Sequence, residues 1–192
     1  EILEDYNAGL GIIALNGPYG ICVDSNNRTI VAESGGSRIT VFDTNGTKLF
    51  SFGSFGGGNG QMNLPWDVTV DSYDNIYVAD SGNNLIQFFD SNGTFLDQMG
   101  GLGVAPGQFN MPKGIFFDSA TGKTYIADTG NHRVQRLTED LVIDTTWGTA
   151  GVVGTTGTVK RDHTGFDRPM DVAVNPVNGN VYVADYGNCR IE

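Results

Sequence analysis

Basic residues are few in this chain of 192 amino acids: 11 lysines and arginines stand against 22 aspartates and glutamates, which gives a net charge of −11. Because a phosphate backbone is bound by clusters of lysine and arginine, we expect no nucleic-acid partner. Long hydrophobic runs are also lacking. None approaches the roughly 18 residues of a membrane span, so we expect no membrane insertion. Since the sequence begins with Glu1 rather than methionine, we expect a processed form or a fragment.

Cysteine and histidine are scarce as well. The two cysteines, Cys22 and Cys189, are too few for a disulfide scaffold, and a chain of this length can bury a core without one. A catalytic zinc site typically takes three protein ligands, often histidines, and only His132 and His163 are present. Neither a Gly-x-Ser-x-Gly motif nor a phosphate loop ending in Gly-Lys-Ser/Thr occurs. We therefore predict no catalytic residue, no metal site and no cofactor.

Glycine, by contrast, is abundant. Its 28 residues show no collagen-like period, which indicates many turns between short elements and favours an all-β fold. Self-comparison reveals four similar segments, each opening with a proline: Pro18, Pro65, Pro112 and Pro169. These prolines follow one another at intervals of 47, 47 and 57 residues. A period of roughly 40–50 residues with short β segments is typical of the blades of a β-propeller.

Each segment predicts four strands, called a, b, c and d in chain order. Strand a follows the proline, whose missing N–H group is tolerated at a strand start, and strand b is the Ile-Tyr-Val-Ala-Asp run or its equivalent. Asn45-Gly46 and Asn92-Gly93 predict tight hairpins between strands c and d, with positive φ at both central residues. The single domain 1–192 then contains blades at about 17–52, 64–99, 111–147 and 168–192, and a separate strand d at 1–5.

The repeated pattern is Pro-x-Gly/Asp-Val-x-Val-Asp, followed by Ile-Tyr-Val-Ala-Asp-Ser-Gly-Asn-x-Arg-Ile. It resembles the NHL repeat, and Asn131-His132-Arg133 and Asn83-Asn84-Leu85 stand where that family has Asn-His-Leu. The resemblance implies a propeller of four-stranded antiparallel blades, about four of them present. Because propellers of this family usually close with six blades, it favours an incomplete arc. A closed four-bladed ring, in which strand 1–5 pairs with residues 189–192, is the alternative.

We interpret the chain as a non-catalytic binding or assembly module that presents propeller loops to a protein or glycan partner. Self-association or further blades would cover its open strand edges. The first alternative is a metal-dependent propeller enzyme, similar to an amidating lyase or a lactonase, whose site is completed by blades absent here. The amidating lyase of the family holds zinc with histidines, which the corresponding strand starts of this chain lack. The second alternative, an RNA-binding NHL domain, is disfavoured by the acidity.

Strand order places the d–a and b–c connections on one end of the propeller, here called the top. The residues after the blade prolines and those in or beside the b–c turns are candidates for binding. A third group lies in the d–a connection that is ten residues longer than the other two, because a lengthened loop often marks a binding face. The candidates are Tyr19, Trp66, Lys113 and Met170; Asn84, His132 and Tyr186; and Lys160, Arg161 and His163.

Several of these candidates also have a plain structural interpretation. His132 occupies the eponymous repeat position, which favours a role in the b–c turn. A carboxylate ends strand b in each blade (Glu33, Asp80, Asp128 and Asp185). A ring of such groups is compatible with Ca²⁺, but an aspartate before Ser/Thr-Gly-Asn more often accepts backbone N–H groups of its own turn. We therefore interpret the carboxylates as structural.

Three Asn-x-Thr sequons begin at Asn27, Asn45 and Asn92, and strand order places all three on the a–b or c–d turns at the bottom of the propeller. Glycosylation there would indicate an extracellular or secreted protein. It would also leave the top free for a partner.

The first prediction concerns these sequons. Chain produced through a secretory pathway should lose mass on treatment with an N-glycosidase, because the three asparagines lie on turns that a glycosyltransferase can reach. Peptide mapping of the same material supplies the decisive reading: three unmodified asparagines would contradict the prediction.

Overall fold

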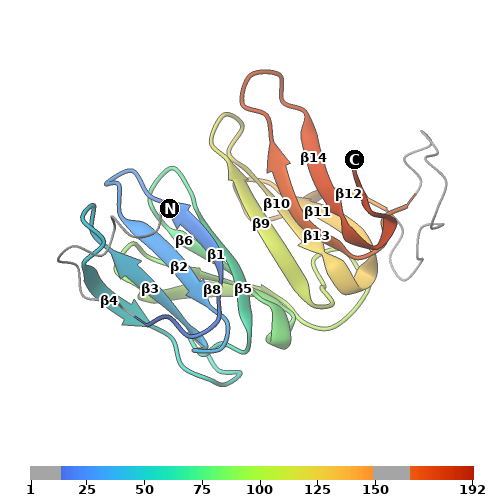
Figure 1. Ribbon diagram of the computed structural model, residues 1–192. Helices are drawn as coiled ribbons and strands as arrows, with labels where there is room; N and C mark the ends of the chain where they lie inside the picture. The colour runs from blue at the N-terminus through green and yellow to red at the C-terminus, as the bar shows by residue number, and fades with distance from the viewer. Residues whose placement is uncertain (1–13, 149–164) are drawn as a thin grey trace.

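The computed structural model describes residues 14–148 and 165–192, which are all-β apart from three short turns of 3-10 helix (Figure 1). The first sheet consists of β1 (Pro18–Val23), β2 (Thr29–Glu33), β3 (Arg38–Phe42) and β4 (Lys48–Phe52). The second consists of β5 (Pro65–Val70), β6 (Ile76–Asp80), β7 (Leu85–Phe89) and β8 (Phe95–Gly100).

The third sheet consists of β9 (Pro112–Asp118), β10 (Lys123–Asp128), β11 (Arg133–Leu137) and β12 (Ile143–Trp147). The fourth has three strands, β13 (Pro169–Val174), β14 (Val181–Asp185) and β15 (Arg190–Ile191). The helical turns η2 (Ser81–Asn83), η3 (Thr129–Asn131) and η4 (Tyr186–Asn188) join strands b and c. In the part of the chain that the structure describes, no helix is long and apolar enough to cross a membrane.

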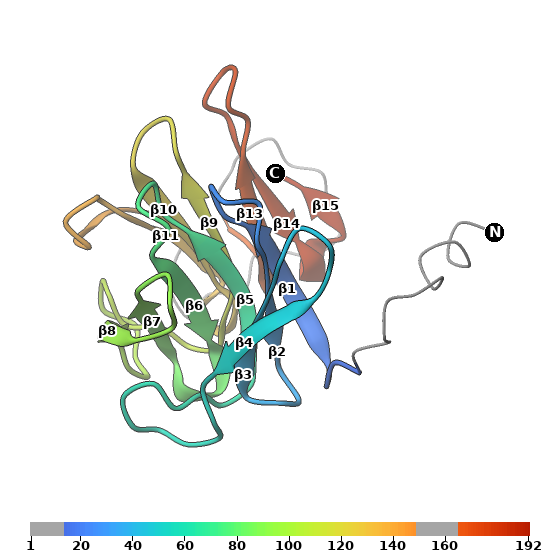
Figure 2. The same cartoon turned by 90° about the vertical axis from the view of Figure 1, so that its left-hand side faces the viewer.

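Every sheet is antiparallel with its strands in chain order, and each packs against the sheet that follows it in the chain (Figure 2). The innermost strands carry this packing: β1 contacts β5, β5 contacts β9, and β9 contacts β13. Three hydrophobic cores lie between successive sheets, centred on Val68, Ile115 and Val172 of strand a. This arrangement confirms the predicted fold class, a β-propeller of four NHL-type blades.

The predicted bounds of strand c at 38–42, 85–89 and 133–137 agree with β3, β7 and β11. The strand d expected at 1–5 lies outside the described residues. Its pairing with residues 189–192, which would distinguish a closed four-bladed ring from an arc, therefore lies outside them too.

A fully buried carboxylate closes strand b in every blade, at Glu33, Asp80, Asp128 and Asp185. Asp80 is representative. Its Oδ1 accepts the backbone N–H of Asn63 (2.8 Å), and its Oδ2 accepts the side-chain amides of Asn83 (2.7 Å) and Gln87 (2.7 Å). The bond to Asn63 ties the connection that enters the blade to the end of strand b. These contacts support the structural interpretation of the carboxylates over a Ca²⁺ site.

The electrostatic balance differs between blades. Burial raises the pKa of Asp80 and Asp128, although hydrogen bonds to each carboxylate oppose the shift. In Glu33 burial acts in the same direction, but hydrogen bonds from Arg38, from the backbone of Asn16 and from Thr40 outweigh it and lower the pKa to about 2. The first blade thus holds its carboxylate ionised by pairing it with an arginine.

The hairpins between strands c and d differ from the prediction in one respect. Gly46 has a positive φ of 78°, but Asn45 does not. The N–H of Gly46 donates to the carbonyl of Asp43 (3.1 Å), and Asp43 Oδ1 accepts the N–H groups of Asn45 (2.9 Å) and Thr47 (2.8 Å). The same turn recurs at 90–93. The prediction of two positive φ angles was wrong because the aspartate builds a wider turn in which only glycine is left-handed.

Glycine and aspartate alternate at one position of strand a: Gly20, Asp67, Gly114 and Asp171. A Cβ atom added to Gly114 would lie 2.5 Å from the Cα atom of Asp171, so only glycine fits between β9 and β13 at this point. Gly20 stands in the same relation to Asp67. In the next interface along, Asp67 Oδ2 accepts the backbone N–H of Ile115 (3.0 Å). Successive blades are therefore joined by two different contacts in turn.

The close approach at Gly114 yields a stability prediction. Gly114→Ala should lower the free energy of unfolding by about 1–3 kcal/mol, because the added methyl group forces β9 and β13 apart. Urea denaturation followed by tryptophan fluorescence measures the change.

Gly57→Ala is the matched control, since its Cβ would meet only the side chain of Asn83, at 3.8 Å. The control should stay within about 0.5 kcal/mol of the wild type. Equal stabilities of the two variants would contradict the prediction.

Candidate functional site

The four residues that follow the blade prolines form a row across the top of the propeller. Tyr19 stacks on Trp66 with ring centroids 4.2 Å apart, and Lys113 Nζ lies 3.8 Å from the centroid of the Trp66 ring. Lys113 Nζ also lies 3.5 Å from Met170 Sδ. We call these four residues the strand-a row. Because each belongs to a different blade, the row brings together four candidates that are far apart in the sequence.

The path of the chain into strand a fixes the direction of this row. The residue before each proline has a left-handed conformation, with φ of 59° at Gly17, 52° at Leu64, 50° at Met111 and 50° at Arg168. For a residue other than glycine this conformation costs about 1–2 kcal/mol, so the surrounding structure must impose it. The recurrence in all four blades shows that the entry into strand a is a fixed feature of the repeat.

Two of the predicted binding residues help to impose it. Asn84 Oδ1 accepts the backbone N–H of Met111 (2.8 Å), and His132 Nδ1 accepts that of Arg168 (3.1 Å). Each therefore ties a b–c turn to the entrance of the next blade. Because His132 Nδ1 acts as an acceptor, it carries no proton in this arrangement. These contacts favour the structural interpretation of His132.

Positive charge gathers at the end of the row. The Lys113 ammonium group contacts the ring of Trp66 and the sulfur of Met170 rather than a carboxylate, and burial together with the nearby charge of Arg168 lowers its pKa. The Arg168 guanidinium group lies 5.5 Å from the ring centroid of Tyr186, which is itself exposed. The row therefore offers aromatic surface and a cation that an anionic group could pair with.

Asp67, next to Trp66, was missed by the sequence analysis. Burial raises its pKa to about 7, against the effect of hydrogen bonds from the backbone of Ile115 and Val68, and the charge of Asp171 raises it further. A carboxylate within an apolar strand, where two other blades have glycine, was the available signal. Because both oxygens accept backbone N–H groups, at 3.0 Å and 2.8 Å, its evident role is to join β5 to β9.

The remaining candidates divide into two groups. Lys160, Arg161 and His163 lie outside the described residues. The sequon asparagines Asn27, Asn45 and Asn92 are exposed on a–b and c–d turns, as strand order predicts, and whether they carry sugars remains a prediction.

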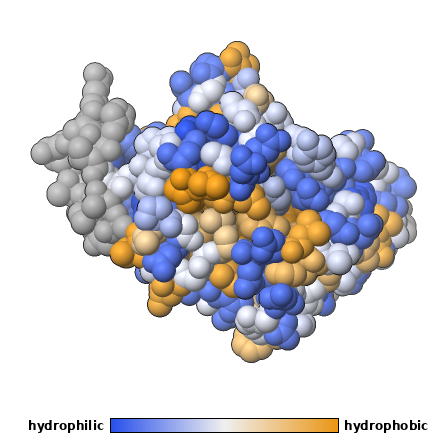
Figure 3. Space-filling view, turned by 180° about the vertical axis from the view of Figure 1, so that it is seen from behind, coloured by the Kyte–Doolittle hydropathy of each residue, from blue (hydrophilic) through white to orange (hydrophobic). Residues whose placement is uncertain are grey.

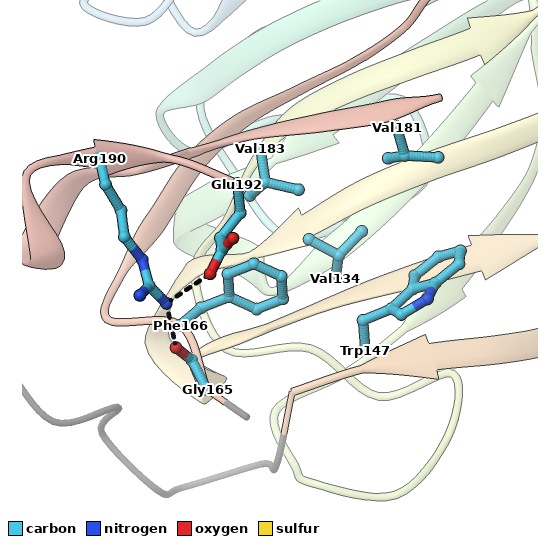
Figure 4. Close-up of a pocket in the computed structure, with 8 residues that line it drawn as sticks. All are labelled: Val134, Trp147, Gly165, Phe166, Val181, Val183, Arg190 and Glu192. Atoms are coloured by element: carbon cyan, nitrogen blue, oxygen red, sulfur yellow. Dashed lines mark hydrogen bonds and ion pairs between the residues drawn. The ribbon is translucent and has the colours of Figure 1, made fainter. Parts of the chain in front are cut away.

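A separate apolar pocket of about 290 Å³ lies between the third and fourth blades, away from the strand-a row (Figure 4). Trp147, Phe166 and three valines form its walls. At its edge Arg190 Nη2 donates to Gly165 O (3.0 Å) and pairs with Glu192 Oε1 (2.9 Å). Its walls continue the core between these blades, and its guanidinium group is already bound, so we interpret it as part of the blade interface.

Apolar side chains are exposed elsewhere too. Phe55, Leu102 and Val104 in the glycine-rich connections are exposed, and the view from behind shows an apolar patch broken up by polar groups (Figure 3). Among residues 14–148 and 165–192, no group of three or more histidine, cysteine, aspartate or glutamate side chains is placed to hold a metal ion. The strand-a row is therefore the feature that best combines exposure with specific chemistry.

The fold and its repeats define the class of protein as a β-propeller with short, four-stranded antiparallel blades. The sequence pattern of the NHL repeat family matches residues 62–89 and 166–192, which include parts of the second and fourth blades. The chain is thus an NHL-repeat β-propeller, as the resemblance predicted. No curated protein matches the sequence.

Solved structures show the same fold at low sequence identity. The chain is similar to a streptogramin B lyase (17% identity, TM-score 0.65), covering 93% of this chain and 51% of that one. It is similar to a catalytically inactive virginiamycin B lyase from Staphylococcus aureus with quinupristin (16%, TM-score 0.68), covering 95% and 54%. A chain of a nidogen/laminin complex also matches (14%, TM-score 0.65), covering 91% and 59%. This chain therefore spans about half the length of each, and the likeness shows the fold alone.

The raised pKa of Asp67 yields a prediction of pH dependence. Since the folded chain holds this proton more tightly than the unfolded chain, whose aspartates titrate near about 4, its contribution to stability is complete below that pH. The contribution is lost as the pH rises through about 7. The free energy of unfolding should therefore fall between pH of about 5 and about 8, and Asp67→Asn should flatten that fall.

Urea denaturation at the two pH values measures the slope. Asp97→Asn, which replaces an exposed carboxylate on β8, is the control and should leave the slope unchanged. If Asp67→Asn and Asp97→Asn show the wild-type slope alike, the prediction is wrong.

Proposed function

We propose that this propeller is a non-catalytic binding module that presents its top to a protein or glycan partner outside the cell. The observation that carries the proposal is the strand-a row, in which Tyr19, Trp66, Lys113 and Met170 meet across four blades. Aromatic residues and methionine are enriched in binding interfaces, and the row assembles them from positions that are distant in the sequence.

The rigidity of the row supports this proposal. Trp66 is held between Tyr19 on one side and Lys113 on the other, so its side chain is already ordered before a partner arrives. A partner that binds ordered side chains loses less conformational entropy, which favours affinity. Tyr19 is 59% exposed and can contact a partner directly.

Charge suggests the kind of surface that would fit. Lys113 and Arg168 place positive charge at the top of a chain whose net charge is −11. A partner with a carboxylate or sulfate group next to an apolar ring face would match both parts of the row. Such groups occur in acidic glycans and in protein surfaces. The exposed sequons on the opposite end support an extracellular location and would leave the row uncovered.

A pair of matched double variants tests the proposal. Tyr19→Ala with Lys113→Ala removes one aromatic ring and one ammonium group from the row. Tyr73→Ala with Lys48→Ala removes the same groups from exposed positions at the other end of the blades. An array of immobilised acidic glycans, neutral glycans and extracellular-matrix proteins supplies the probes.

We expect the wild type and the Tyr73/Lys48 variant to retain the same probes, and the Tyr19/Lys113 variant to bind them about tenfold more weakly or worse. Circular dichroism establishes that both variants are folded. The proposal fails if the wild type retains no probe, or if the two variants bind equally well.

A further inference from the structure

The outward face of the fourth blade repeats the face with which the second blade holds the third. The two sets of residues occupy the same repeat positions in strands a, b and c. Asp171, Tyr182, Ala184 and Ile191 of the fourth blade correspond to Asp67, Tyr77, Ala79 and Ile86 of the second.

In the second blade this face is fully used. Asp67 Oδ2 accepts the backbone N–H of Ile115 on β9 (3.0 Å), and the ring of Tyr77 meets that of Phe117 edge-on, with centroids 6.4 Å apart. Ile86 packs in the same buried cluster as Ile115 and has no exposed surface. Strand a of the third blade thus docks through one polar contact and two apolar side chains.

In the fourth blade the same face is uncovered. Ile191 is 67% exposed and Tyr182 is 43% exposed. Asp171 Oδ1 accepts the backbone N–H of Val172 (2.8 Å), just as Asp67 does with its neighbour. In the described residues no hydrogen bond joins the other oxygen of Asp171 to a partner. A groove of about 140 Å³ runs over this face between Asp171 and Ile191.

The matching half of such an interface is present at the other end of the chain. Ile21 and Val23 on β1 occupy the repeat positions of Ile115 and Phe117, the two residues that dock onto the second blade. They are 65% and 57% exposed. The pairing of β1 with β2 shifts between Pro18 and Ile21, the same place at which β9 and β10 shift, so the backbone is shaped alike in both blades.

We propose that the fourth blade of one copy of this chain docks onto the first blade of a second copy. Asp171 accepts the N–H of Ile21 of the second copy, and Tyr182 and Ile191 cover its Ile21 and Val23. The contact is head-to-tail, since each copy contributes a different face. It continues the series of blade interfaces beyond one polypeptide, and it does not depend on the strand-a row.

Light scattering coupled to gel filtration of the full chain, over a dilution series, tests the proposal. We expect a mass that rises with concentration in multiples of 20.5 kDa. Ile191→Asp and Ile21→Asp each spoil one half of the contact at an exposed position, so each variant alone should be a monomer. Leu49→Asp, an equally conservative change at an exposed position of β4, should associate like the wild type.

Mixing the two monomeric variants gives the decisive reading. Each retains the half that the other has lost, so the mixture should form a dimer of twice the chain mass that grows no further. Three results would each overturn the proposal: a wild type that is monomeric throughout, as expected if another blade or another protein covers these faces; a variant that still associates; or a mixture that stays monomeric.

Discussion

The buried carboxylate at the end of strand b is the interaction on which each blade depends. A carboxylate with no exposed surface is costly unless donors surround it, and each blade supplies them from its own repeat. In the third blade Asp128 accepts hydrogen bonds from the backbone of Asn110 and from the side chains of Asn131, Arg133 and Gln135. One oxygen pair thereby holds the entering connection, the b–c turn and strand c together. The residue types that define the repeat are those that satisfy this group.

This constraint also explains why one end of the propeller suits recognition. The carboxylates fix the d–a and b–c connections at the top, and Asn84 and His132 then tie each top turn to the following blade. The residues after the prolines project from this cross-linked layer, so their relative positions vary little. At the bottom, the turns are closed by aspartates that bind only their own backbone, as Asp43 does. The bottom turns are therefore independent of one another.

The sequence predicted most of what lies within a blade. Strand c at 38–42 and 85–89 could be placed because the repeat aligns without gaps there, and equal positions in successive blades explain why Tyr19 and Trp66 are neighbours. The turn at Asn45 was predicted wrongly because an Asn-Gly pair has two possible settings, and a side chain outside the pair decides between them. The role of Asp67 could not be predicted, because its donor, the backbone of Ile115, belongs to another blade and depends on how the two sheets pack.

The alternation of Gly20, Asp67, Gly114 and Asp171 makes neighbouring blades unlike at their inner strands. Where a glycine-bearing strand precedes an aspartate-bearing one, backbone and side chain touch directly. In the reverse order, the aspartate reaches across to an N–H group. The true repeating unit around the axis is therefore a pair of blades, and a circle that keeps this rule all the way round can close only with an even number. Adding a single blade would set two aspartates, or two glycines, side by side, and so parity limits the assemblies this scaffold can enter.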